Sequence, residues 1–174
     1  MMNVTSSKKT TISQIQRIIL LLSALLLAIF LFFVRGGIKT RAPLEQLARQ
    51  SLNPESALSN GRPTVIEFYA DWCEACQEMA PAMLSIKNEF KGEVDFVLLN
   101  VDNNLWKDLI DEYSVRGIPQ LNFFDINGVS TGRSIGLKRY EQIRSLTKSF
   151  LNNEQLPSLI VDGKLSKLEN NLPI

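Results

Sequence analysis

YADWCEACQEMAP, residues 69–81, joins two different local patterns. Residues 64–70 (TVIEFYA) are β-branched and aromatic and predict a strand, whereas residues 73–90 have the composition of a helix. Cys73 is therefore expected at a helix N-terminus, where unpaired N–H groups and the helix dipole favour a thiolate. Cys76 follows one turn later, so the two sulfurs should face each other.

This cysteine pair predicts redox chemistry. A thiolate at Cys73 can attack a disulfide in a partner protein, and Cys76 can then resolve the mixed disulfide. That order of events needs an exposed sulfur at Cys73 and a covered one at Cys76. A purely structural disulfide is the alternative, although closing so short a loop removes little chain entropy. Haem attachment would need histidine after the second cysteine, where Gln77 stands.

The rest of the composition excludes several classes of site. The 174 residues contain no histidine and only these two cysteines. Ser-His and Cys-His catalysis, His-ligated metals and a tetrahedral zinc site are therefore excluded, and we expect neither a metal nor a cofactor. Residues 60–150 carry ten Lys and Arg against thirteen Asp and Glu, so nucleic acid is not an expected partner.

Residues 18–34 (IILLLSALLLAIFLFFV) form an apolar run with one polar member, Ser23. As a helix the run would span roughly 25 Å, slightly less than a bilayer's hydrocarbon core. We interpret residues 15–38 as a transmembrane anchor that contacts the bilayer through 18–34. A cleaved signal peptide and a buried core helix are the alternatives. Basic residues flank the run on both sides, so charge does not settle its orientation.

The remaining segments divide into a predicted domain and its flanks. Residues 1–14 are expected to be disordered, and 39–52 to form a juxtamembrane linker. Within that linker, Pro43 followed by LEQLARQSL predicts either a short helix or a stiff spacer. From residue 53 to 151, strand and helix patterns alternate, with an amphipathic helix expected over residues 104–113, and Asn127-Gly128 marks a hairpin. This order predicts an α/β fold with parallel and antiparallel strand pairs. The tail, 152–174, is either a solvated tail with a few docked apolar residues or an element that docks a partner, and residues 159–163 suggest a small strand and turn within it.

Two motifs together resemble the thioredoxin superfamily. They are the active-site segment 69–81 and Val115-Arg116-Gly117-Ile118-Pro119, which resembles the family's cis-proline loop. The resemblance implies a thioredoxin fold, a central mixed sheet flanked by helices, here preceded by the apolar helix. Together with the anchor and the tail, it extends to the membrane-anchored thioredoxin-like thiol:disulfide interchange proteins of cyanobacteria and chloroplasts, which support cytochrome assembly in the thylakoid lumen.

The resemblance also implies roles for individual residues. Cys73 would be the nucleophile and Cys76 the resolving cysteine of a redox disulfide. Pro119 would be the cis-proline facing the sulfurs, and the backbone of Ile118 would pair with an extended client segment. Trp72 would shield the disulfide and contact clients.

The resemblance further implies that Pro81 kinks the active-site helix, because it lacks an N–H group. Glu67 stands where the family usually has a buried aspartate, and it could relay the proton of Cys76. A buried carboxyl with satisfied hydrogen bonds and no catalytic role is the alternative. Leu99 is expected at the position of the lysine that often accompanies that aspartate.

The direction of electron flow follows from local charge. No Lys or Arg occurs between Pro63 and Ile86, whereas several carboxylates do, and these oppose a thiolate at Cys73. A strong oxidant needs a stabilised thiolate, so we predict a reductant. A disulfide-donating oxidant and a redox-inert peptide-binding scaffold are the alternatives.

A reductant outside the cytoplasm would need a membrane thiol-electron donor. Its clients would carry reactive cysteines or disulfides, as apocytochromes do. The resemblance places the protein in a thylakoid or plasma membrane, with the thioredoxin domain on the lumenal or periplasmic side.

Overall fold

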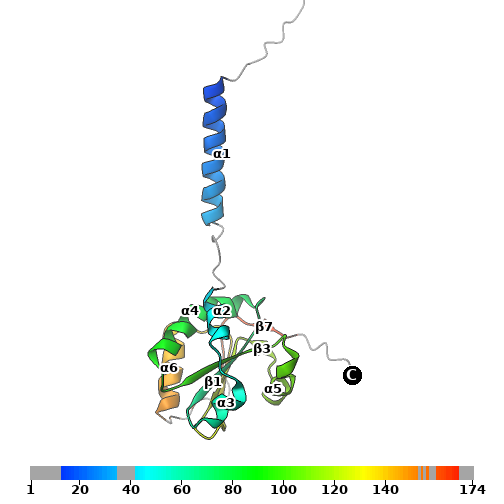
Figure 1. Ribbon diagram of the computed structural model, residues 1–174, viewed down its shortest axis with the longest axis vertical. Coiled ribbons are helices and arrows are strands. Elements are labelled where there is room, and N and C mark those ends of the chain that lie inside the picture. The colour runs from blue at the N-terminus through cyan, green and yellow to red at the C-terminus, as the bar shows by residue number, and fades with distance from the viewer. Residues whose placement is uncertain (1–12, 35–41, 153, 155, 157–159, 169–174) are drawn as a thin grey trace, which may run out of the picture. The chain divides into compact units, whose positions relative to one another are not determined.

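The computed structural model describes residues 13–34, 42–152, 154, 156 and 160–168, and the chain divides into two compact units, 1–40 and 41–174. The first unit contains helix α1 (Gln14–Val34), drawn in blue in Figure 1. Ser13 begins it with reciprocal hydrogen bonds, because its hydroxyl accepts from the N–H of Gln16 and the Gln16 side chain accepts from the N–H of Ser13.

Helix α1 is long and apolar enough to cross a membrane over the window Gln14–Leu31. None of that window is buried, which argues against the core-helix alternative. An anchor and a signal sequence both fit the helix. Of the segment predicted to be disordered, 1–14, residues 1–12 lie outside the described residues, as does the predicted end of the anchor at 35–38. Ser13 and Gln14, by contrast, form the start of α1.

The second unit is built on a mixed sheet in the order β2-β1-β4-β5-β6. Its strands are β1 (Thr64–Tyr69), β2 (Asp95–Asn100), β4 (Gln120–Phe124), β5 (Ser130–Ile135) and β6 (Ile160–Val161). β1 pairs parallel with β2 and antiparallel with β4, whereas β5 pairs antiparallel with β4 and parallel with β6. All six residues of β1 are buried because this strand lies inside the sheet and is covered on both faces.

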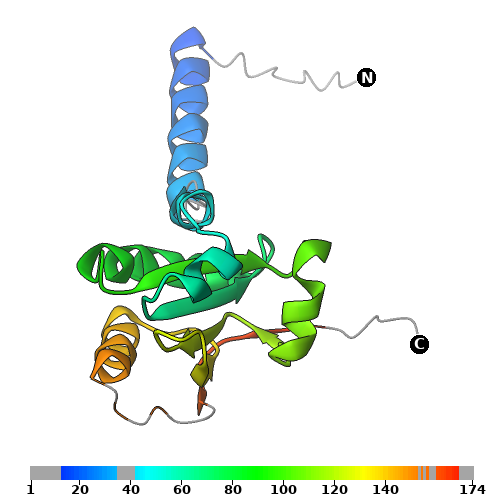
Figure 2. The ribbon, with the colours of Figure 1, turned by 60° about the horizontal axis from the view of Figure 1, so that its bottom comes forward.

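Helices cover both faces of this sheet (Figures 1 and 2). They are α2 (Ala42–Arg49), α3 (Pro54–Ser59), α4 (Glu74–Glu89), α5 (Lys107–Glu112) and α6 (Tyr140–Leu151). α4 contacts α2 and α6, and Figure 1 shows α4 and α6 on the side of the sheet opposite α5. On the α5 side, the Tyr113 ring lies 5.2 Å from that of Phe124 and 6.3 Å from that of Phe68. The predicted thioredoxin fold is confirmed.

Two segments differ from the expectation. The stretch predicted as a linker contains α2, whose Leu44 and Leu47 are buried in the core. The helix expected over residues 104–113 is instead a 3-10 turn, η1 (Asn104–Trp106), followed directly by α5. Asn103 caps η1 with its side chain, which accepts from the N–H of Leu105 and favours the tighter turn there.

The described part of the tail is packed onto the domain. Besides β6, it forms β7 (Ser166–Lys167), which pairs antiparallel with β3 (Gly117–Ile118) in a separate two-stranded sheet. Gly163 turns the chain between β6 and β7 with a φ of 80°, a left-handed conformation that glycine adopts without strain. The small strand and turn suggested for this segment are present, and its backbone pairs with the domain although residues 161–164 and 167 are exposed.

Candidate active site

Cys73 and Cys76 lie where central strand β1 gives way to helix α4. Cys73 is the N-cap of α4, and its sulfur accepts a hydrogen bond from the N–H of Cys76 at 3.1 Å. A disulfide joins the two residues, whose Cα atoms are 5.3 Å apart. An N–H group directed at Cys73 Sγ would also stabilise a negative charge there after reduction, as would the helix dipole.

The cis-proline loop lies against this sulfur. The Ile118–Pro119 peptide bond is cis, and the carbonyl oxygen of Ile118 is 3.8 Å from Cys73 Sγ. Ile118 and Pro119 are both buried. The fold thus brings two segments, separated by more than forty residues in the chain, to one point at the end of the central strand.

Both cysteines are fully buried, with none of their surface exposed. The sequence predicts an exposed nucleophilic sulfur at Cys73, and the structure differs on this point. The carbonyl oxygen of Ile118 lies beside the Cys73 sulfur, and β7 pairs with the strand that contains Ile118. A partner sulfur can reach Cys73 only if part of this cover moves.

Glu67 is buried in the middle of β1, and neither of its carboxyl oxygens has a hydrogen-bond partner. Burial raises the pKa of Glu67 to about 8, so the carboxyl holds a proton at neutral pH. The alternative, a buried Glu67 carboxyl whose hydrogen bonds are all satisfied, therefore does not match the described residues. Its register partner on β2 is Leu98, and Leu99 is the next residue along that strand.

Trp72 is half exposed beside the disulfide, and its indole Nε1 donates to Asp102 at 2.9 Å. This hydrogen bond fixes one edge of the ring and leaves much of its surface open to a partner. Pro81 lies inside α4 on its exposed side. Because proline has no N–H, the helix lacks the bond from residue 81 to the carbonyl of Gln77.

A cation from the tail, which the local sequence gives no reason to expect, lies at the site. Lys164 Nζ lies 2.9 Å from the carboxylate of Glu74, the residue that follows Cys73. The pKa of Lys164 is raised by this hydrogen bond. Ninety residues separate the pair, and no sequence pattern links them. The net negative charge around the active-site segment is therefore smaller in the folded protein than the sequence of that segment indicates.

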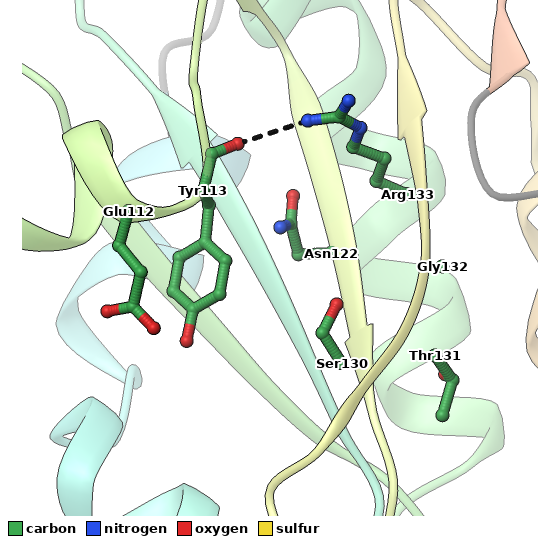
Figure 3. A pocket seen from close by; sticks show the side chains of 7 residues that line it. All are labelled: Glu112, Tyr113, Asn122, Ser130, Thr131, Gly132 and Arg133. Carbon is green, nitrogen blue, oxygen red and sulfur yellow. Dashed lines mark hydrogen bonds between the residues drawn. The ribbon is translucent and has the colours of Figure 1, made fainter.

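A separate hollow of about 290 Å³ lies along β5 and the end of α5 (Figure 3). Its lining includes Glu112, Tyr113, Asn122 and Arg133, and Arg133 donates to the carbonyl oxygen of Tyr113. None of the residues predicted for the active site lines it. Within the part of the chain that the structure describes, no three Cys, Asp or Glu side chains gather as metal ligands.

Comparisons with known proteins agree with this geometry. The sequence profile of the thioredoxin family matches residues 46–149. A mutant thioredoxin from Halobacterium salinarum superposes with a TM-score of 0.50 at 27% identity, covering 62% of this chain and 90% of that one.

Three curated relatives extend the similarity. The thioredoxin-like protein HCF164, chloroplastic, of Arabidopsis thaliana is 39% identical over 79% of this chain and 53% of its own length. The thiol:disulfide interchange protein TxlA homolog of Synechocystis is 39% identical, covering 73% of this chain and 71% of its own. For TxlA of Synechococcus elongatus the values are 33%, 92% and 84%. The chain spans about half the length of the chloroplastic relatives it matches.

Proposed function

Because the chain belongs to the thioredoxin family, we propose that it is a membrane-anchored thiol:disulfide oxidoreductase that exchanges disulfides with extracytoplasmic proteins. One observation carries the proposal. The Cys73–Cys76 disulfide sits at the N-terminus of α4, against the carbonyl oxygen that precedes a cis-proline. This arrangement combines a stabilised thiolate, a resolving sulfur one turn away and a backbone edge for an extended client.

In the reducing direction, the Cys73 thiolate attacks one sulfur of a client disulfide. A mixed disulfide forms and one client thiolate leaves. The Cys76 thiolate then attacks Cys73 Sγ, which closes the intramolecular disulfide and releases the second client sulfur. Two electrons pass to the client, and the two protons lost by the protein's thiols are taken up by the client's thiolates, directly or through water.

We assign the proton of Cys76 to Glu67. Glu67 lies buried on β1, the strand that leads into the Cys73–Cys76 segment. With a pKa raised to about 8 by burial, its carboxyl can both accept and return a proton near neutral pH. Trp72, Ile118 and Pro119 would contact the client, and Pro81 would shape the helix that carries Cys76.

The proposed direction is reduction of clients. Carboxylates at Asp71, Glu74 and Glu78 flank the pair. Lys164 forms an ion pair with Glu74 and interacts electrostatically with Glu78 as well, so three carboxylates face one cation there. A thiolate in such surroundings is stabilised less than that of a strong oxidant. The proposal includes a membrane thiol-electron donor and clients with reactive cysteines, among them apocytochromes.

The proposed setting is a thylakoid or plasma membrane, with the second unit on the lumenal or periplasmic side. The apolar helix α1 and the chloroplastic relatives support a membrane anchor. The side of the membrane would decide which donor and which clients the protein meets.

Trapping tests the exchange reaction. A full-length Cys76→Ser variant should accumulate mixed disulfides through Cys73, and mass spectrometry would identify the clients. The matched control, Cys73→Ser with Cys76→Ser, should trap none. Equal trapping by both variants, or full biological activity of Cys73→Ser, would favour the redox-inert scaffold.

A redox titration tests the direction. We expect a potential close to the thioredoxin value of about −270 mV. A reduction potential of about −120 mV would identify a disulfide donor instead.

A further inference from the structure

Strand β7 of the tail lies along the same edge, β3, that an extended client would need. Gly117 is opposite Lys167 and Ile118 is opposite Ser166, in antiparallel register. The ladder continues for one more residue, because the N–H of Leu168 donates to the carbonyl of Arg116 at 3.2 Å. Figure 1 shows β3 and β7 side by side.

The alternation of antiparallel ladders fixes which groups are engaged. Residues that exchange hydrogen bonds recur at every second position, so the bond between Arg116 and Leu168 makes Ile118 and Ser166 the next bonded pair. Both the N–H and the C=O of Ile118 therefore face β7. A residue has one backbone donor, so Ser166 and a client cannot both pair with Ile118 in this way.

Specific contacts hold the tail in this place. Lys164 pairs with Glu74, and the carbonyl oxygen of Lys164 accepts from the N–H of Leu137 at 2.7 Å. Upstream, the N–H of Asp162 donates to the carbonyl of Ile135, and buried Lys138 binds both the carboxylate and the carbonyl oxygen of Asp162. The tail is thus attached to the domain directly before β7.

The contacts nearest the sulfurs are the weaker ones. The side chains of Lys164 and Glu74 are 51% and 62% exposed, and exposed ion pairs add little stability. β7 is only two residues long and pairs on one side. The segment can therefore leave β3 while the turn around Asp162 and Lys138 stays in place.

We propose that residues 164–168 are an intramolecular competitor for clients, a strap that occupies the edge of β3 until a client displaces it. The inference rests on the proposed function. The strap occupies the backbone groups of Ile118, the residue whose carbonyl oxygen lies 3.8 Å from Cys73 Sγ. A client must open the strap before its own segment can pair, whereas a small disulfide needs no backbone pairing.

Two proline substitutions in β7 test the strap without changing the rest of the domain. Ser166→Pro removes the N–H that faces Ile118, whereas Lys167→Pro removes one at a non-bonded, exposed position and is the matched control. Full-length, pre-reduced protein in detergent would be mixed with insulin or with hydroxyethyl disulfide, and oxidation followed by tryptophan fluorescence. We expect Ser166→Pro to speed insulin reduction about threefold to tenfold, the factor set by one backbone hydrogen bond.

The same variant should leave the reaction with hydroxyethyl disulfide unchanged, and Lys167→Pro should change neither rate. An unchanged or slower insulin reaction in Ser166→Pro overturns the strap. Wild-type protein that reduces neither disulfide overturns the proposed function instead, so the two failures are distinct.

Hydrogen exchange gives a readout independent of rate. A cysteine-containing peptide would be trapped on Cys73 in the Cys76→Ser variant. The amides of Ser166 and Leu168 should then lose protection, while that of Asp162 keeps it. Retained protection at Ser166 and Leu168 in the trapped complex would show that clients bind without moving the strap.

Discussion

At residue 67, a carboxyl lies inside the sheet among apolar neighbours, opposite Leu98 on one side and Leu121 on the other. Nothing in the described structure donates a hydrogen bond to it. An ionised carboxylate is therefore strongly disfavoured there, and the protonated form is the stable one at neutral pH. Both the pH dependence of the folding stability and the rate of proton transfer should therefore depend on this side chain.

We predict that the oxidised protein loses stability as the pH rises through the interval from 4.5 to about 8. The folded state keeps the Glu67 proton over this interval whereas the unfolded state releases it, so the unfolded state gains stability with pH. The slope from this group is about 1.4 kcal/mol per pH unit. Chemical denaturation at a series of pH values measures it.

Glu67→Gln should remove that slope and raise stability at the alkaline end of the interval. Glu93→Gln, at an exposed position, is the matched control and should keep the wild-type slope. Parallel pH profiles for wild type and Glu67→Gln would contradict the prediction.

Glu67→Gln should also slow resolution of the mixed disulfide at neutral pH. The expected loss is about tenfold, because water can partly replace the missing base. Stopped-flow measurement of client release separates this step from the first attack, which should keep its rate. A loss confined to the first attack would contradict the assignment of Glu67 to Cys76.

The chemistry at residue scale could largely be predicted from the sequence, because strand-to-helix spacing alone places Cys73 at a helix N-terminus. The position of Lys164 could not, because an ion pair across ninety residues depends on the whole path of the chain. The burial of Cys73 was missed for the same reason, since Ile118, which lies against its sulfur, comes from a distant part of the chain.

At the scale of elements, helix α2 extends the domain toward the N-terminus. Leu44 and Leu47 lie three residues apart on one face and are almost completely buried, and α2 packs on α4. The sequence left a short helix and a stiff spacer as alternatives for this segment, and the helix is the one that forms. Only the partner surface on α4 distinguishes an eight-residue amphipathic helix from a linker, and the local sequence does not contain that surface.

Leu47→Ala should therefore destabilise the domain by about 3 kcal/mol, as expected for a truncated, fully buried leucine. Leu52→Ala, at a side chain that is 43% exposed, should change stability by less than about 1 kcal/mol. Urea denaturation of both variants gives the comparison. Equal effects would mean that α2 contributes no more than a linker.

The turn that connects β6 to β7 depends on Gly136 and Gly163, both with positive φ. A Cβ on Gly136 would collide with the carbonyl oxygen of Asp162, whereas one on Gly61, which has a similar φ of 78°, would meet nothing within 4 Å. Strands of two residues are too short to show an alternation of apolar and polar residues. The sequence could therefore suggest a short strand near residue 160, but it could not predict that the whole segment docks on the domain.

Gly136→Ala should accordingly release the tail. Trypsin should cut after Lys164 and Lys167 at least about tenfold faster than in wild type, because cleavage follows the population of the open form. Gly61→Ala has the same backbone strain without the collision and should keep the wild-type rate. Mass spectrometry of timed digests identifies the sites.

At the scale of the whole molecule, the chain consists of two units with separate internal contacts. Residues 41–174 contain all the described core and the complete sulfur site. We predict that this segment alone folds with the melting temperature of the full chain in detergent, as measured by circular dichroism. A melting temperature lower by 10 °C or more, roughly 2 kcal/mol for a domain of this size, would mean that the first unit supports the second.

The full chain, with α1 present, should stay with membranes after alkaline carbonate extraction, whereas residues 41–174 should be released. The amino-terminal sequence of the mature protein distinguishes an anchor from a cleaved signal peptide, because only the anchor keeps residues 14–34.

The position of β6 at the edge of the sheet also affects how copies of the protein behave when they are crowded together. β6 pairs with only Ser134 and Ile135 of β5, so two residues of the tail close part of an otherwise open strand edge. Proteins confined to a surface meet one another often, and unpaired strand edges readily join with those of neighbouring copies. Shortening the chain before residue 160 would therefore promote lateral self-association, a hazard quite separate from any change in chemistry.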